Sequence, residues 1–387
     1  MFIMAKKDPS EPAAAPAAVL REPAEIRHAD QFEALRQNDS DTPPPAWKLS
    51  PRSVFTYIVG GKPLKAKIDG KAVEVPITRK FFGEDSLVER AIVTLASERA
   101  LLLVGEPGTG KSYLSEHLSA AVSGNSCLTI QGTAGTTEEH IKYSWNIARV
   151  IAEGPTPDNL IPAPTMVAMR NGALLRFEEI TRCVPDVQDA LVSILSDKAI
   201  AVPELPDHNM VWARTGFNVI ATANTRDQGV NELSAALKRR FNYIYIPIVA
   251  DQKTEIEIVQ QRSTELLSRY DIPTKLPPPV IELLAIVFRE LRQGKTADGV
   301  SIKKPSTTLS TAEAIGTALD AVLHARFFGT KPVGPEHIAR NLVGSIVKED
   351  LGDLDILKEY VVLVGKKRAA GNKAWKEFHD ALLAELR

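Results

Sequence analysis

The chain has 387 residues, of which 44% are hydrophobic and 25% are charged, and its formal net charge is −1. This is the composition of a globular protein of two or three domains, and the near-zero charge excludes a general attraction to nucleic acid or anionic lipid. The chain has only two cysteines, Cys127 and Cys183, and no apolar run of about 18 residues, which predicts a cytoplasmic protein without a membrane span.

Residues 1–46 are rich in alanine and proline and have little periodic apolar content. Such a segment buries too little surface to offset its loss of chain entropy, so we predict that it is disordered or acts as a tether. Its stretch EIRHADQFEALR, residues 25–36, has the pattern of a short helix that would form on a partner.

Residues 47–82 are predicted to form a small β element and linker. Apolar residues alternate from Ser53 to Thr78, beginning with FTYIV at residues 55–59. They flank Asp69-Gly70, a dipeptide typical of a hairpin turn.

Residues 83–250 alternate short apolar runs with helical patterns. Five such runs end at or lie near Gly105, Gly132, Phe177, Asn224 and Tyr243. Short β-rich runs separated by helices predict a parallel α/β sheet that is covered on both faces.

Residues 251–387 carry amphipathic helical patterns without a strand signal, so we predict a helical lid and C-terminal helical region. The clearest helix, Ser310 to Arg326, opens with a capping box in which Glu313 is the second member. Further helices are predicted to begin at Pro335 and after Asn372.

The segment GEPGTGKS, residues 105–112, lies between a predicted strand and a predicted helix and fits the phosphate-binding pattern GxxxxGK[ST]. In such a loop the backbone N–H groups surround phosphate oxygens, Lys111 reaches the β and γ phosphates, and the Ser112 hydroxyl ligates Mg²⁺. We therefore predict a nucleoside triphosphate site. Its predicted residues are Gly105, Glu106, Pro107, Gly108, Thr109, Gly110, Lys111, Ser112 and Tyr113.

The stretch GALLRFEEITR, residues 172–182, ends a predicted strand with two adjacent carboxylates. P-loop enzymes hold the metal with an acid at the end of a neighbouring strand, normally Asp, and Glu178 stands there. Glu179 follows and fits the role of general base for the attacking water. Glutamate at the first position is a departure, because its extra methylene moves the oxygens outward by about a bond length. Arg176, inside the strand, has no explanation from the sequence.

These motifs resemble those of AAA+ ATPases of the MoxR family, in the dynein-related clade with a helix 2 insert. GEPGTGKS matches Walker A, LLRFEEI matches Walker B, and the match covers residues 82–250 well and the lid more weakly. The resemblance implies a P-loop AAA+ fold, with a parallel five-stranded sheet flanked by helices and a C-terminal all-helical lid domain. It also implies ATP and Mg²⁺ as cofactors.

The resemblance assigns further site residues. ATAN matches sensor 1, which implies that Asn224 orients the lytic water or reads the γ-phosphate. LKRRF resembles the finger segment, with Arg240 as the arginine finger acting in trans and Arg239 as the second candidate. Arg182 also matches an arginine that follows Walker B in the family, without an assigned role.

The lid departs from the family pattern. MoxR relatives generally place a sensor 2 arginine at the start of a lid helix, whereas here that helix begins with Ser310, Thr311 and Ala312. Either Lys303 or Lys304 substitutes by reach, or the contact is missing.

Two segments resemble accessory elements of the clade. Residues 136–169 resemble the helix 2 insert that projects toward the ring pore, with Tyr143 and Trp145 as candidate pore aromatics. Residues 197–205 and 209–224 resemble the hairpin that precedes sensor 1.

A finger acting in trans implies an oligomer, and the family usually forms hexameric rings. The leading prediction is an ATP-hydrolysing ring that remodels or activates a protein client, with a von Willebrand factor A domain protein as candidate partner. One alternative is a nucleotide-gated scaffold that hardly turns over. The other is a nucleic-acid translocase of the restriction-motor type, against which the near-neutral charge counts.

Overall fold

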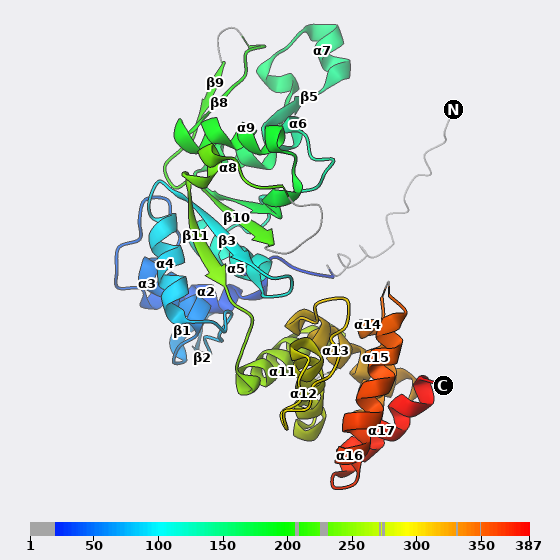
Figure 1. Ribbon diagram of the computed structural model, residues 1–387. Coiled ribbons are helices and arrows are strands. Elements are labelled where there is room, and N and C mark those ends of the chain that lie inside the picture. The colour runs from blue at the N-terminus through cyan, green and yellow to red at the C-terminus, as the bar shows by residue number, and fades with distance from the viewer. Residues whose placement is uncertain are drawn as a thin grey trace, which may run out of the picture.

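The computed structural model describes residues 20–205, 209–224, 231–270, 272, 275–329, 332–348 and 350–387. An α/β domain with a five-stranded sheet is followed by a helical domain that lies to one side of it (Figure 1). Residues 1–19, part of the segment predicted to be disordered, lie outside the described residues.

The sheet is parallel and has the strand order β11-β3-β10-β7-β4. Its strands are β3 (Ala100–Gly105), β4 (Thr129–Gln131), β7 (Leu174–Glu178), β10 (Asn218–Asn224) and β11 (Phe241–Ile246). The predicted five-stranded parallel sheet is therefore confirmed. Because its strands are parallel, their carboxyl ends meet at one edge, where Asn224 pairs with Gly105 and Gln131 with Glu178.

Helices cover both faces of this sheet, and the alternation of side chains along β3 shows why. Leu101 and Leu103 belong to a core shared with helices on one face, whereas Leu102 and Val104 belong to a second core on the other face. The first core includes α4 (Asp85–Leu95) and α5 (Lys111–Ser123). The second includes α8 (Pro164–Asn171), α9 (Pro185–Ser196) and α10 (Ala235–Lys238).

The prediction of disorder is wrong for residues 20–46. They include helices α1 (Ala24–Arg27) and α2 (Ala29–Asn38), whose Phe32 and Leu35 are buried in the core on the α5 side of the sheet. The helix predicted at residues 25–36 thus forms on its own domain. Overall composition was misleading because a few apolar side chains at helical spacing suffice to anchor the segment.

The segment after it is only partly as predicted. Strands β1 (Leu64–Ile68) and β2 (Lys71–Val75) form the expected antiparallel hairpin, with Asp69 and Gly70 at its turn in left-handed conformations. The preceding stretch, expected to be extended, is instead helix α3 (Pro51–Val59). Ser50 caps this helix by accepting a hydrogen bond from the Ser53 N–H, and Pro51 suits its first turn.

Two accessory hairpins lie at the end of the α/β domain remote from the helical domain (Figure 1). The first follows α6 (Glu138–Ile141) and pairs β5 (Tyr143–Trp145) with β6 (Leu160–Pro162), enclosing α7 (Ile147–Glu153) and a 3₁₀ turn (Pro157–Asn159). The second pairs β8 (Ala199–Ala201) with β9 (Met210–Trp212). The first hairpin lies in the segment that resembles the helix 2 insert, and the second lies in the segment that resembles the hairpin before sensor 1.

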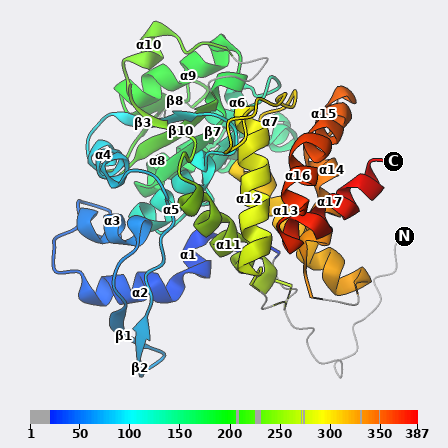
Figure 2. The same ribbon diagram turned by 60° about the horizontal axis from the view of Figure 1, so that its bottom comes forward.

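The C-terminal domain is helical with its own hydrophobic core, as predicted (Figure 2). Its helices are α11 (Gln252–Ser268), α12 (Pro278–Gln293), α13 (Thr311–Phe328), α14 (Pro335–Ile346), α15 (Gly352–Tyr360), α16 (Lys366–Ala369) and α17 (Lys373–Glu385), with a π-helical turn at Val361–Gly365. The capping box of Ser310 and Glu313 is present at the start of α13. None of the helices in the described part of the chain is both long and apolar enough to cross a bilayer.

Candidate nucleotide site

The predicted phosphate loop joins the end of β3 to the start of α5. Gly108 and Gly110 have φ angles of 75° and 85°, in the left-handed region that favours glycine. A Cβ on Gly108 would also lie 2.2 Å from the Cβ of Ser310, so the loop and the start of α13 approach too closely for a side chain. The glycines therefore give this loop its shape and let the helical domain reach it.

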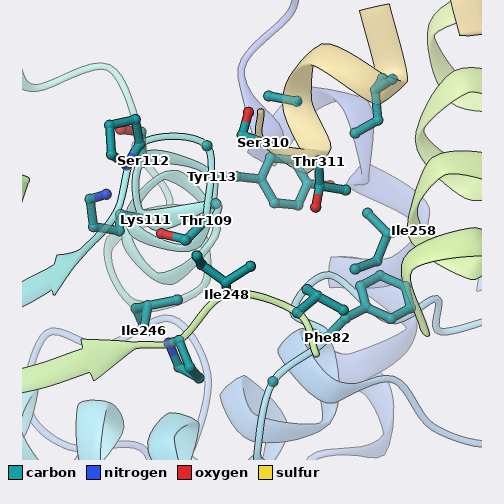
Figure 3. A pocket seen from close by; sticks show the side chains of 18 of the residues that line it. Phe82, Thr109, Lys111, Ser112, Tyr113, Ile246, Ile248, Ile258, Ser310 and Thr311 are labelled. Carbon is teal, nitrogen blue, oxygen red and sulfur yellow. The ribbon is translucent and has the colours of Figure 1, made fainter. Parts of the chain in front are cut away.

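The loop lines a cavity of about 410 Å³ between the two domains, within the usual range for small-molecule sites. Residues 107–113 contribute one wall, and Glu179, Thr222 and Asn224 line it from the sheet edge. Figure 3 shows Ser310 and Thr311 facing the loop from the start of α13, Ile246 and Ile248 beside the loop, and Phe82 and Ile258 farther from Lys111. The cavity thus combines a polar phosphate loop with apolar side chains, as a nucleotide requires.

Lys111 is buried at the start of α5. Its Nζ donates to the carbonyl oxygens of Gly105 and Glu106, at 3.0 and 2.7 Å. These contacts place its charge inside the loop, where backbone N–H groups and the amino end of α5 also favour an anion.

Glu178 is buried at the end of β7 and accepts hydrogen bonds on both oxygens. Its Oε2 accepts from the hydroxyls of Ser112 at 2.7 Å and Thr222 at 2.8 Å, and its Oε1 accepts from Ser115 at 2.5 Å. Burial alone would raise the pKa of this carboxyl, but the charge of Arg176 and the three hydroxyl donors together lower it below its ordinary value. The group is therefore an anion at neutral pH.

Arg176, unexplained by the sequence, is the cationic partner of that carboxylate. Its Nη2 lies 2.8 Å from Glu178 Oε1, and both side chains are nearly buried, with exposed fractions of 12% and 5%. A buried carboxylate needs such a partner, and positions i and i+2 of a strand place the two side chains on one face.

Glu179 differs from its neighbour. It has a φ of 54° and its N–H donates to Thr222 Oγ1 at 2.9 Å, so its side chain turns into the cavity. There its carboxylate lies 2.5 Å from Nε of Arg182, which is in the 3₁₀ turn Ile180–Arg182. The arginine that follows Walker B is thus the ionic partner of the predicted general base.

The donor set at the polar end suits a hard divalent cation. Ser112 Oγ and Glu178 Oε2 are adjacent oxygen donors beside the cavity, and oxygen donors are what Mg²⁺ prefers. No group of three or more His, Cys, Asp or Glu side chains that could hold a metal ion occurs in the described ranges.

The remaining predicted residues fall at two opposite edges of the sheet. Asn224 lies beside Gly105 and lines the cavity. Arg239 and Arg240 precede Phe241, which pairs with Ala100, five residues before the loop and so about 16 Å from it along the strand. Arg240 donates to Ser196 and to the Ala236 carbonyl oxygen, so it points away from the cavity of its own chain.

The helical domain supplies arginines that the sequence reasoning missed. Of the two alternatives for the missing sensor 2 arginine, substitution by Lys303 or Lys304 has no support here, because neither lines the cavity and Lys303 Nζ lies 4.0 Å from Glu359. Arg262 and Arg292 line it instead, from α11 and the last turn of α12. No sequence motif marks Arg262 and Arg292, because they lie on helices before α13, the helix at whose start the family places its sensor 2 arginine.

The two arginines have different partners. Arg262 lies over the Tyr113 ring, 3.9 Å from its centroid, and donates to the Tyr113 hydroxyl at 2.6 Å. Arg292 bonds both oxygens of the buried Glu255, at 2.8 and 2.7 Å. Arg262 therefore links the helical domain to the first turn of α5.

Comparison with known proteins identifies both domains. The model of the AAA domain (dynein-related subfamily) matches residues 100–241, and that of the YehL-like AAA+ ATPase C-terminal domain matches residues 253–384. YehL of Escherichia coli (strain K12) is 42% identical over 364 residues, which are 93% of this chain and 96% of YehL. The gas vesicle ATPase GvpN of Haloferax mediterranei is 26% identical over 50% of this chain and 57% of GvpN.

Among solved structures, NtrX from Brucella abortus in complex with ATP is similar with a TM-score of 0.46 and 13% identity. The match covers 78% of this chain and 66% of NtrX.

Proposed function

The chain belongs to the MoxR-like AAA+ ATPases of the YehL type, and we propose that its ring oligomer couples ATP binding and hydrolysis to the remodelling or activation of a protein client. The observation that carries this proposal is the separation of Glu179 from Arg240. Glu179 faces the cavity, whereas Arg240 lies at the opposite edge of the sheet. A complete site would then need two copies of the chain, as in a family that usually forms hexameric rings.

The residues at the polar end divide the chemistry among them. Lys111 would bind the β and γ phosphates, and Ser112 and Glu178 would hold Mg²⁺, which would supply positive charge to offset that of the phosphates. Asn224 orients the attacking water beside that phosphate.

Glu179 accepts a proton from the attacking water. Because its carboxylate is held by Arg182, we expect the two side chains to separate before the water is activated. The finger arginine of the neighbouring subunit, Arg240 with Arg239 as second candidate, stabilises the charge that develops on the γ-phosphate.

A nucleotide-gated scaffold is the second candidate. It is favoured by the same Glu179–Arg182 contact and by the absence of arginine from the first turn of α13. If Arg182 never releases the base, the chain would bind ATP and assemble but hardly turn over. A nucleic-acid translocase is the third, and the net charge of −1 gives it no support.

Partner and location complete the proposal. A von Willebrand factor A domain protein is the proposed partner, on the strength of the MoxR resemblance alone. A cytoplasmic location is proposed because Cys127 and Cys183 are both free thiols, and disulfides are rare in that compartment.

The test is ATP turnover measured over a range of protein concentrations, alongside the mass of the protein in solution with and without ATP and Mg²⁺. We expect turnover per subunit to rise with concentration as the oligomer forms. Assembly on ATP with negligible turnover would favour the scaffold. Full turnover by a monomer would contradict the shared site.

A further inference from the structure

Arg176 and Glu178 occupy two positions at which this chain is unusual, and they contact each other. We propose that Arg176 is a positioning residue that fixes the Glu178 carboxylate, so that a glutamate can hold the metal where this family normally uses aspartate. The inference rests on the proposed function of Glu178 as metal acid.

The guanidinium of Arg176 connects three parts of the α/β domain. Besides Glu178, it donates from Nη2 to the Ser112 carbonyl oxygen at 3.2 Å and from Nε to Ser115 Oγ at 3.1 Å. Its Nη1 donates to the carbonyl oxygen of Ser126, in the segment before β4, at 3.0 Å. A planar guanidinium with several donors in a fixed geometry is suited to this role in a way that a lysine is not.

The contacts on Glu178 divide its two oxygens between support and function. Arg176 and Ser115 bind Oε1, whereas Ser112 and Thr222 bind Oε2. The oxygen held by Arg176 is therefore the one away from Ser112, and the other is left beside the proposed metal ligand.

This division of contacts explains how a glutamate at position 178 can keep its carboxylate in one place despite its longer side chain. Its side chain has one more rotatable bond than aspartate, so an unsupported carboxylate would sample more positions and lose more entropy on binding a metal. The Arg176 contact fixes that bond before the nucleotide arrives. Partners that orient a metal ligand commonly change metal affinity by about 10- to 100-fold when removed.

The support extends to the N-terminal segment. Ser126 donates from its N–H and its hydroxyl to the two oxygens of Glu25, at 3.0 and 2.7 Å, while its carbonyl oxygen accepts from Arg176. Glu25 belongs to α1. A connected path of hydrogen bonds thus runs from α1 through Ser126 and Arg176 to Glu178.

The experiment measures the affinity of the full-length protein for a fluorescent, non-hydrolysable ATP analogue, in EDTA and in excess Mg²⁺. The affinity in Mg²⁺ divided by the affinity in EDTA measures how much the metal strengthens nucleotide binding, and it does not depend on ATP hydrolysis. We expect Arg176→Met to reduce this ratio about ten-fold while its affinity in EDTA stays within about two-fold. The control is Arg149→Met, on the exposed surface of α7.

A paired substitution separates positioning from folding. Arg176→Leu combined with Glu178→Asp restores the ordinary Walker B pattern, so the ratio is expected to recover most of its wild-type value. A ratio that is unchanged or increased in Arg176→Met would overturn the inference, and an increase would mean that Arg176 merely repels the cation. A paired variant no better than Arg176→Met would also contradict it.

If Arg176→Met does not fold, a milder variant tests whether the contacts of Arg176 position Glu178. Glu25→Gln weakens only the outer end of the path, with Glu22→Gln, exposed just before α1, as its control. We expect the ratio of affinities to be about two-fold lower for Glu25→Gln and unchanged for Glu22→Gln. Equal ratios for the two variants would overturn the inference. Failure of the proposed function is distinguishable, because the wild-type protein itself would then show no Mg²⁺-dependent binding.

Discussion

Glu178 and Glu179 are consecutive, yet their carboxylates face different surroundings. Glu178 is buried among Arg176 and three hydroxyl groups, whereas Glu179, in a left-handed backbone conformation, turns toward the cavity and Arg182. The backbone turn between them therefore separates a buried carboxylate held by four donors from one that lines the cavity. This arrangement underlies the prediction for Glu179 made below.

Substitution Lys111→Ala should abolish nucleotide binding, because it removes the buried ammonium inside the phosphate loop. A charge-assisted contact with a triphosphate is worth at least about 1.4 kcal/mol, or ten-fold in affinity. Equilibrium binding of a fluorescent ATP analogue measures the loss. Lys303→Ala is the control, since Lys303 does not line the cavity, and equal affinities for the two variants would rule out the phosphate-loop assignment.

Substitution Glu179→Gln should leave ATP bound but stop its hydrolysis. The amide keeps the shape of the side chain and cannot accept the proton, which lowers turnover by about 10²- to 10⁴-fold. Single-turnover hydrolysis and ATP affinity are measured on the same sample. Normal turnover in this variant would place the general base elsewhere.

Removal of the Phe32 side chain should destabilise the α/β domain, because α2 is part of its core. Phe32→Ala is expected to lower the free energy of unfolding by about 3 kcal/mol, whereas Ile26→Ala, at a position 56% exposed, should change it by less than about 0.5 kcal/mol. Denaturant unfolding of the full chain measures both. Equal stabilities would mean that residues 20–46 do not pack on the domain in solution.

Acid should lower the free energy of unfolding through two histidines, His28 at the end of α1 and the buried His117 in α5. Burial and the nearby Lys80 and Arg27 lower the pKa of His28 from 6.5 to about 3, and burial lowers that of His117 well below 6.5. Between those values the unfolded chain binds more protons, so the free energy of unfolding falls as pH falls below 6.5, by at most about 1.4 kcal/mol per pH unit for each group.

Thermal unfolding of the nucleotide-free protein from pH 7 to pH 5 measures this dependence. His28→Phe removes one of the two groups and should reduce the slope, whereas His140→Phe, at an exposed position, should not. Identical slopes for wild type and His28→Phe would show that His28 titrates normally in the folded protein.

The sequence was sufficient for features that depend on local spacing. The glycines and the lysine from Gly105 to Ser112 mark a phosphate loop, and the residues on either side predict the strand before it and the helix after it. The parallel sheet follows from the alternation of short apolar runs with helices. Asn224 could then be placed beside the loop, because parallel strands end at one edge.

Features that depend on contacts between distant segments could not be predicted. The role of Arg176 requires knowing that Ser112 and Ser126 lie beside β7, and that of Arg262 requires the position of α11 over Tyr113. The stretch FTYIV fits a strand or a helix equally well by composition, and Ser50 and Pro51 decide for α3 at its start.

The central claim is that each ATP site is shared between two subunits, and mixing two inactive variants tests it most directly. Arg240→Ala lacks the finger and Glu179→Gln lacks the base, so neither should hydrolyse ATP alone. In an equimolar mixture roughly one interface in four combines an intact base with an intact finger, and we predict that turnover reappears accordingly. A mixture as inactive as its components, in oligomers shown to exchange subunits, would contradict a site completed by Arg240 of a neighbour.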